Sequence, residues 1–273
     1  MGLKDKFNSN IDPWLCYYCG DCSETCPRDA NPGEMMMSAR RYLTSVYDWT
    51  GLSGLFFKSV PALIIAFVLV AVSIIGVGYA KQFNLESIME FGHVFEKMLI
   101  FSVVVLILIP NIFHMFTQKK SLKCEKNTFR WFEHLLVVFG YILLLITTVF
   151  LNWFSTENTY IIWFGYIVGG LVFIITFDFI LERVKKKKEL SKFSHPSDWL
   201  FVIWLFLMGF TAFIVRILID TDLISNNLWL YIVHLIVIAQ WGILIVPFGK
   251  WTHFLYRSFA VYFANIKSAE LNS

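Results

Sequence analysis

Charged side chains are scarce in this chain of 273 residues. Only 16% of its residues are Asp, Glu, Lys or Arg, and 57% are apolar. Soluble domains average about 25% charged residues. The composition therefore excludes an ordinary water-soluble domain and predicts that lipid is the main solvent, and we expect no nucleic-acid partner.

Sequence patterns of independent catalysis are missing as well. The chain holds no nucleophile–base arrangement, no phosphate-binding loop and no paired-carboxylate site. No secretory signal is recognisable either, because the first ten residues, MGLKDKFNSN, are polar and the first long apolar run follows Ser59. We expect a subunit without substrate chemistry of its own, whose N-terminal segment stays on the cytoplasmic side.

Long apolar runs, in contrast, are abundant. A helix that crosses a bilayer needs about 20 apolar residues, and six runs meet that requirement. They are Val60–Ala80, Met98–Phe116, Trp131–Leu151, Ile161–Leu181, Trp199–Ile219 and Leu228–Phe248. The sequence therefore predicts an all-α membrane protein, with a bundle of six transmembrane helices in residues 59–273 and a small N-terminal headpiece in residues 1–58.

Positive charge is concentrated in two of the connections between these runs. The segments QKKSLKCEKNTFR and ERVKKKKELSKF follow the second and fourth runs, whereas the other connections are acidic or neutral. Basic loops stay in the cytoplasm. An even number of spans then places both termini in the cytoplasm, in agreement with the polar N-terminus.

Cysteine is confined almost entirely to one short stretch of the headpiece. Cys16, Cys19, Cys22 and Cys26, followed by Pro27, form the pattern C-x2-C-x2-C-x3-C-P. In a segment that is not secreted, such spacing favours a metal or cluster site over disulfides. The short gaps are typical of a [4Fe-4S] cluster, because neighbouring thiolates can surround one cubane.

Two alternatives concern the ligands of this site. Zinc would compete for the thiolates, but structural zinc sites usually pair two short turns across a longer gap. In ferredoxins with two clusters, the fourth cysteine of such a run binds the other cluster. This chain has no second run, so we expect Cys26 to complete the set, with Cys124 in the first basic loop as the alternative.

The six histidines can be sorted by their predicted depth in the membrane. Two lie toward the outer ends of spans, three lie at cytoplasmic ends, and one lies in the lysine-rich loop, where we expect it to be solvated; in that order they are His93, His234, His114, His134, His253 and His195. Ionisable residues inside a membrane are costly and usually functional. Two tiers of histidines suit b-type haem with two histidine ligands.

The spacing within the last span fits two such tiers. His234 and His253 are 19 residues apart in the sequence, which corresponds to about 28 Å along one helix. Cations flank each tier and could pair with haem propionates, although basic residues at span ends also simply reach for the interface. They are Arg130 and Lys250 on the inner side, and Lys97 and Arg216 on the outer side.

Several segments resemble known families. RWFEHLLVVFGYILLL, HPSDWLFVIWLFLMGFTAFIV and HLIVIAQWGILIVPFGKWTHFLY resemble haem-b membrane subunits related to the gamma subunit of respiratory nitrate reductase, and in particular the membrane subunit of heterodisulfide reductase. WLCYYCGDCSETCPRDANPGEMM resembles the small iron–sulfur subunit of heterodisulfide reductase. A fusion of these two parts is the plan of the membrane subunit of the quinone-interacting membrane-bound oxidoreductase complex.

The resemblance implies roles for individual histidines. His134 and His253 fall on the positions of the inner haem pair, and His234 falls one residue away from the outer ligand. The position of the second outer ligand is occupied by Leu144, so His93 would have to replace it. A second departure is the single cysteine run, because the small subunit normally carries two.

The resemblance also implies a function. Electrons would pass between a soluble flavin or iron–sulfur subunit in the cytoplasm, the cluster, one or two haems, and quinone or menaquinone in the cell membrane of a prokaryote. The quinone site is expected in the outer half, beside His93, His234 and Glu96, with an inner pocket near His114 as the alternative. A redox-sensing transporter and a purely structural anchor are the competing functions.

Overall fold

The computed structural model describes residues 3–16, 18, 20–28, 30–103, 128–146, 159–186 and 194–270. This described part is helical throughout and contains no β-strand. Its principal helices are α1 (Leu3–Asn8), α2 (Asp12–Leu15), α3 (Asp21–Glu24), α4 (Pro32–Tyr47), α5 (Leu52–Lys58), α6 (Val60–Ala80), α7 (Leu85–Val103), α9 (Thr128–Leu145), α11 (Thr159–Lys185), α13 (Pro196–Asp220), α14 (Leu228–Gln240), α15 (Val246–Phe248) and α16 (Thr252–Glu270).

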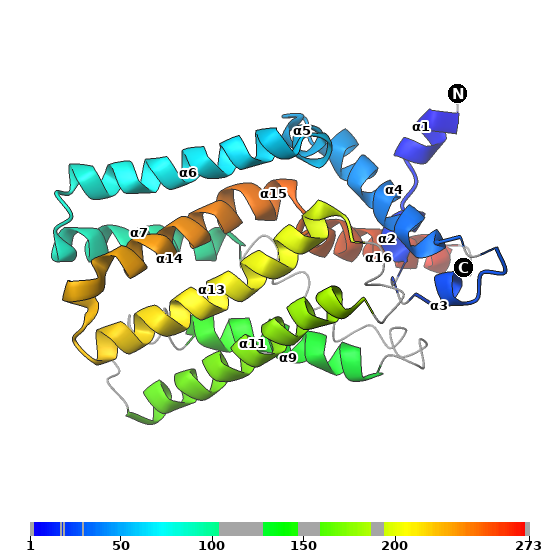
Figure 1. The fold of residues 1–273 in the computed structure, drawn as a ribbon. Helices are drawn as coiled ribbons and strands as arrows, with labels where there is room; N and C mark the ends of the chain where they lie inside the picture. The colour runs from blue at the N-terminus through cyan, green and yellow to red at the C-terminus, as the bar shows by residue number, and fades with distance from the viewer. Residues whose placement is uncertain are drawn as a thin grey trace.

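The long helices form a bundle, and the short helices gather at one end of it (Figure 1). Through the bundle, α9 packs on α11, α11 on α13, α13 on α14, and α14 on both α6 and α7. Helices α2, α3 and α4 lie at the same end as α16, and both ends of the chain are found there. The headpiece therefore sits against one end of the bundle.

The headpiece helix α4 begins at a strong sequence signal. The Asn31 side chain accepts a hydrogen bond from the Glu34 amide at 3.1 Å, and Pro32 occupies the first helical position. Asparagine is a favoured helix cap, and proline loses no hydrogen bond in the first turn. The helix predicted after Pro32 is confirmed.

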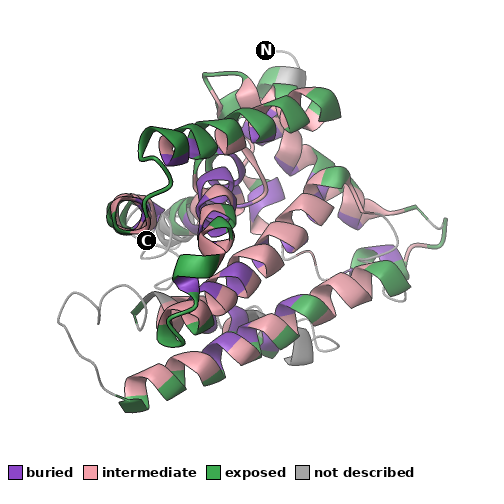
Figure 2. Ribbon diagram, turned by 60° about the vertical axis from the view of Figure 1, so that its left-hand side comes forward, coloured by how far each residue is buried: buried purple, intermediate pink, exposed green. Residues whose placement is uncertain are grey.

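Helix α6 shows the environment for which the bundle is built. It begins at a Ser59 cap and spans the predicted residues Val60–Ala80. Most of its surface is exposed (Figure 2), including Ile65, Leu69 and Val72, each more than half accessible. A large exposed apolar face marks a surface that meets lipid or another apolar partner, and the length of the helix suits a bilayer.

Four helical stretches are long and apolar enough to cross a membrane. They are Val60–Ala80, Thr159–Lys185, Pro196–Asp220 and Ile224–Ala264. Together they indicate a membrane protein. The other two predicted spans, Met98–Phe116 and Trp131–Leu151, extend into residues 104–127 and 147–158, which lie outside the described residues.

The connection predicted between the first two spans is partly wrong. Helix α7 begins at Leu85, so residues 85–97 are helical rather than part of an outer loop. The side chain of Asn84 accepts a hydrogen bond from the Ser87 amide at 3.0 Å and caps this helix. Ile88 is 2% exposed and packs in a cluster with Tyr231 of α14. Burial of this face stabilises a helix that its charged residues concealed.

The last predicted span is not a single helix. Helix α14 ends at Gln240, and a π-helical turn, Trp241–Ile245, leads into the short α15 and a bend at Gly249. Pro247 lacks the amide that would continue a regular ladder. A Cβ atom on Gly249 would lie 2.5 Å from the Ile245 carbonyl oxygen, so the bend requires glycine. The separation expected along one helix is therefore wrong, because His234 and His253 belong to different helices.

Helix α16 joins the bundle to the headpiece. Trp14 of α2 is 2% exposed and its ring lies 5.0 Å from that of Tyr256. Leu43 of α4 and Ala260 of α16 belong to the same buried cluster. The division at residue 58 remains a prediction, but the headpiece core includes part of the C-terminal helix.

Candidate functional site

The cysteine segment forms a tight loop around α3. Cys16 ends α2, Cys22 lies in α3 and Cys26 follows it. Cys16 and Cys26 are half-buried, Cys22 is exposed, and all three are free thiols. Cys19 lies outside the described residues.

The local backbone is suited to binding at sulfur. Tyr18 and Gly20 adopt left-handed conformations, with φ of 54° and 94°. The Tyr18 amide donates a hydrogen bond to the Cys16 sulfur at 3.4 Å. Hydrogen bonds to sulfur are one means by which proteins tune iron–sulfur clusters. The thiols, their spacing and this amide fit the chemistry of such a cluster.

The complete ligand set is not visible in the part of the chain described. There, no three or more His, Cys, Asp or Glu side chains lie close enough together to hold a metal ion. The predicted set includes Cys19, and the alternative fourth ligand Cys124 also falls outside the described residues. Cluster ligation by Cys16, Cys19, Cys22 and Cys26 therefore stays a prediction.

Two arginines from opposite ends of the chain meet at the cysteine loop. Arg40 of α4 and Arg257 of α16 both donate to the Cys16 carbonyl oxygen. Arg40 also donates to the Pro13 carbonyl at 2.7 Å and is only 7% exposed. Burial, followed by repulsion from Arg257, lowers the pKa of Arg40 to about 10. The loop is thus fixed to both α4 and α16.

His253 lies in the first turn of α16, one helical turn before Arg257. Its Nδ1 lies 2.6 Å from the Lys250 carbonyl oxygen. A carbonyl can only accept, so Nδ1 carries the proton and Nε2 carries the lone pair. Metal-binding histidines commonly donate their other nitrogen to a carbonyl in this way. The state of His253 fits that of an iron ligand.

The predicted partner of His253 lies on α9. The side chains of His134 and Arg130 lie outside the described residues, although α9 itself is described. Val137, one turn after His134, packs in the same apolar cluster as Trp251 and Phe254. The structure thus brings the backbone of α9 to the residues that flank His253.

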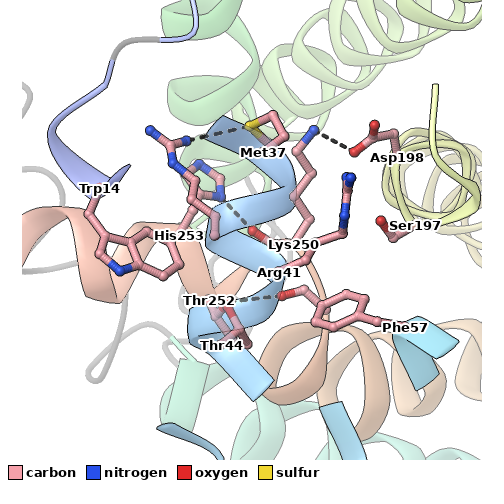
Figure 3. Close-up of a pocket in the computed structure, with 12 residues that line it drawn as sticks. Trp14, Met37, Arg41, Thr44, Phe57, Ser197, Asp198, Lys250, Thr252 and His253 are labelled. Atoms are coloured by element: carbon pink, nitrogen blue, oxygen red, sulfur yellow. Dashed lines mark hydrogen bonds and ion pairs between the residues drawn. The ribbon is translucent and has the colours of Figure 1, made fainter. Parts of the chain in front are cut away.

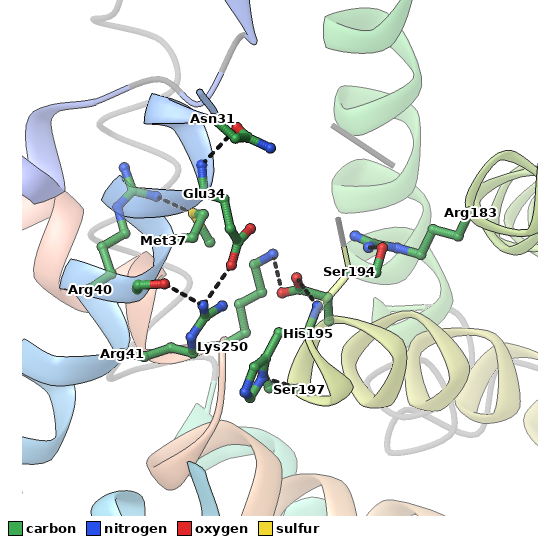
Figure 4. A network of polar contacts seen from close by, with 12 residues as sticks. Asn31, Glu34, Met37, Arg40, Arg41, Arg183, Ser194, His195, Ser197 and Lys250 are labelled. Atoms are coloured by element: carbon green, nitrogen blue, oxygen red, sulfur yellow. Dashed lines mark hydrogen bonds and ion pairs between the residues drawn. The ribbon is translucent and has the colours of Figure 1, made fainter. Parts of the chain in front are cut away.

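Lys250 is already paired. Its ammonium nitrogen lies 2.6 Å from Asp198, which is 2% exposed, and 5.7 Å from the centre of the Tyr18 ring (Figure 4). The predicted contact with a haem propionate would compete with Asp198. The pair connects the start of α13 to the bend before α16, and Tyr18 extends this connection to the cysteine loop.

A small pocket lies where these elements meet (Figure 3). The headpiece contributes one wall, and the ends of α13 and α16 contribute the other. Its lining combines apolar and basic side chains, namely Trp14, Met37, Arg40, Arg41, Thr44, Phe57, Ser197, Asp198, Gly249, Lys250, Thr252 and His253. The pocket is thus directly beside the candidate iron ligand.

The outer tier of predicted residues is brought together only in part. His234 is buried, its Nδ1 lies 2.8 Å from Thr211, and its Nε2 lies 3.9 Å from Glu96 of α7. His93 is exposed, and Lys97 lies next to Glu96 on α7. Arg216 instead pairs with Asp220 at 2.8 Å, one turn away on α13.

Part of the chain is similar to a C-like subunit of heterodisulfide reductase from Archaeoglobus profundus. The two proteins are 38% identical over 47 residues, which are 17% of this chain and 25% of the relative. The chain thus spans about a quarter of the length of this curated relative. No family model matches the chain, and no solved structure matches it.

His195 has a different role from the solvated one expected. Its Nδ1 accepts a hydrogen bond from the Ser197 amide at 3.2 Å, and Asp198 accepts one from the His195 amide at 3.3 Å. This reciprocal pair caps the first turn of α13. Burial, followed by the charge of Arg41, lowers the pKa of His195 and favours the neutral form that caps.

The arginine pair and Asp198 were not predicted from the sequence. Arg40 and Arg257 lie far apart along the chain, and their shared acceptor is a backbone carbonyl, which leaves no residue pattern. The signal present was charge in an apolar setting, because both arginines have aromatic and aliphatic residues nearby in the sequence. Asp198 similarly precedes a long apolar run, where a carboxylate needs a partner.

Proposed function

We propose that this chain is an electron-transfer subunit of a respiratory oxidoreductase complex in a prokaryotic cell membrane. It would pass electrons between a cytoplasmic flavin or iron–sulfur subunit and the membrane quinone pool. The four apolar helices and the similarity to a C-like subunit of heterodisulfide reductase support a membrane-bound redox subunit.

One observation carries the proposal furthest. The loop that holds the cysteines is attached to α16, the helix whose first turn holds His253. Arg257 contacts Cys16 and lies four residues after His253, a rise of about 6 Å along the helix. A cluster site and a haem-ligand site on one helix suit electron passage, whereas a structural anchor has no need of this arrangement.

The cofactors proposed are a [4Fe-4S] cluster and b-type haem, both of which accept and donate single electrons when bound. Cys16, Cys19, Cys22 and Cys26 would hold the cluster, and His134 and His253 would hold the haem. In this arrangement the Lys250 carbonyl fixes the tautomer of His253, and Trp251 and Phe254 exclude water from the region beside it.

The quinone site is proposed in the outer half of the bundle, with quinone or menaquinone as the substrate. Thr211 donates to the Leu207 carbonyl at 2.7 Å, so it accepts from His234 Nδ1, and the lone pair of Nε2 is on the side of Glu96. A histidine and a carboxylate so placed can take up quinol protons. A second haem at His93 and His234 is the alternative role of the same residues, and the pocket beside His253 is the alternative quinone site.

The soluble partner is proposed to dock at the end of the bundle where both chain ends lie. That end carries the exposed Cys22, the most accessible of the described cysteines. In the predicted topology this end faces the cytoplasm.

Composition analysis of the purified full-length protein tests the proposal. We expect non-haem iron and acid-labile sulfide in equal amounts, together with b-type haem in the visible spectrum. Cys22→Ser should abolish the low-temperature resonance of the reduced cluster and leave the haem spectrum intact. Zinc in place of iron, or a protein without haem, would overturn it.

A further inference from the structure

The Arg40 guanidinium is a buried charge with neutral partners. Its hydrogen bonds reach the carbonyls of Pro13 and Cys16 and the sulfur of Met37, and its central carbon lies 5.7 Å from the centre of the Trp14 ring. Within the described part of the chain, it forms no ion pair with a carboxylate. Burial of a charge is costly unless an opposite charge compensates it.

The surroundings of Arg40 add positive charge. Arg257 donates to the same carbonyl as Arg40, so two guanidinium groups meet at one oxygen atom. Lys250, whose ammonium group faces the Tyr18 ring, is balanced by Asp198. Arg41 is balanced by Glu34 at 2.6 Å. The uncompensated charge is therefore that of Arg40, and it lies at the first cysteine of the loop beside a second guanidinium.

We propose that Arg40 and Arg257 are positioning residues that place positive charge beside the cluster and raise its reduction potential. This inference rests on the proposed function, because it presumes a cluster at the cysteine run. A [4Fe-4S] core with four thiolates is dianionic when oxidised and trianionic when reduced. The group that the loop is proposed to bind thus supplies the negative charge that Arg40 lacks.

The effect on potential follows from the sign of the charges. Reduction adds one electron to an anionic group, and nearby cations stabilise the more negative state by the larger amount. Net charge and hydrogen bonds around the sulfurs are among the factors that set cluster potentials. Arg257 has a further consequence, since it places this stabilisation on the helix that carries His253.

Redox titration of the cluster, followed by its low-temperature resonance, tests the inference in the full-length protein. Arg40→Gln and Arg257→Gln should each shift the midpoint to lower potential, and Arg257→Lys should recover part of the shift. Arg28→Gln is the matched control, because Arg28 is exposed and follows Cys26 in the same segment. Its midpoint should stay near that of the unmodified protein.

Two results separate the inference from the proposed function. Arg257→Gln protein with an intact cluster and an unchanged midpoint would overturn the inference and leave the cluster proposal standing. An unmodified protein without any cluster would overturn the proposed function itself. If Arg40→Gln fails to accumulate, Arg257→Gln decides alone, because its side chain is only half-buried. Loss of cluster content with no change in midpoint would indicate a merely structural role and contradict the inference.

Discussion

At the scale of single residues, the proposed chemistry depends on side chains whose state is set by their neighbours. The sequence predicted which cysteines and histidines could act, because ligand types and spacing are visible in it. It could not predict that Lys250 fixes the tautomer of His253, or that Arg40 and Arg257 share one carbonyl. These contacts involve backbone atoms, and the shared carbonyl joins distant segments.

Replacement of His253 tests the inner haem directly. His253→Ala should abolish a low-spin b-type signal in the spectrum, because its Nε2 is the proposed iron ligand. His114→Ala, at another predicted cytoplasmic span end, is the control and should retain the signal. If His114→Ala removes the haem and His253→Ala does not, the assignment is wrong.

His195 should make the stability depend on pH. Its pKa in the folded protein is lowered, so the unfolded chain binds the proton more readily. The neutral cap is fully present above the unfolded pKa of about 6.5. Stability should fall as the pH drops below that value, until the folded histidine is also protonated.

His195→Asn provides the matched variant, because asparagine caps helices without titrating. The difference in melting temperature between the two proteins should therefore widen toward acidic pH. A difference that is independent of pH would show that the imidazole does not cap α13 through its neutral form.

At the scale of elements, the sequence was most reliable where one period governs a whole helix. Helices α6, α11 and α13 lie close to their predicted ranges because long apolar runs leave no alternative in a membrane. The start of α7 and the whole of α16 were missed, since they carry charged residues and are stabilised by packing on α14 and on the headpiece. The break before α16 depends on a backbone contact at Gly249.

The bend itself can be tested. Gly249→Ala should destabilise the protein by about 1–3 kcal/mol, the usual cost of overpacking, because the added methyl group meets the Ile245 carbonyl. Gly170→Ala in α11 is the control, since nothing lies within 4 Å of its added methyl group. Melting temperatures in detergent would show this, with a fall only in the first variant. Equal melting temperatures would contradict the tight bend.

At the scale of the whole molecule, the fold brings the two ends of the chain together. The cysteine loop, near the N-terminus, and α16, near the C-terminus, meet at the buried cluster of Trp14, Leu43 and Ala260. The sequence predicted a headpiece and a bundle as separate parts, and it held no signal for the helix that unites them. This junction is what makes a continuous electron path from the membrane to the headpiece physically reasonable.

Quinol-driven reduction of the purified protein tests that path most directly. A reduced menaquinone analogue should reduce the haem and then the cluster, followed by absorbance and by low-temperature resonance in the same sample. In His253→Ala protein with an intact cluster, cluster reduction should be lost or slowed by orders of magnitude. Equal rates of cluster reduction with and without His253 would contradict a path through the junction.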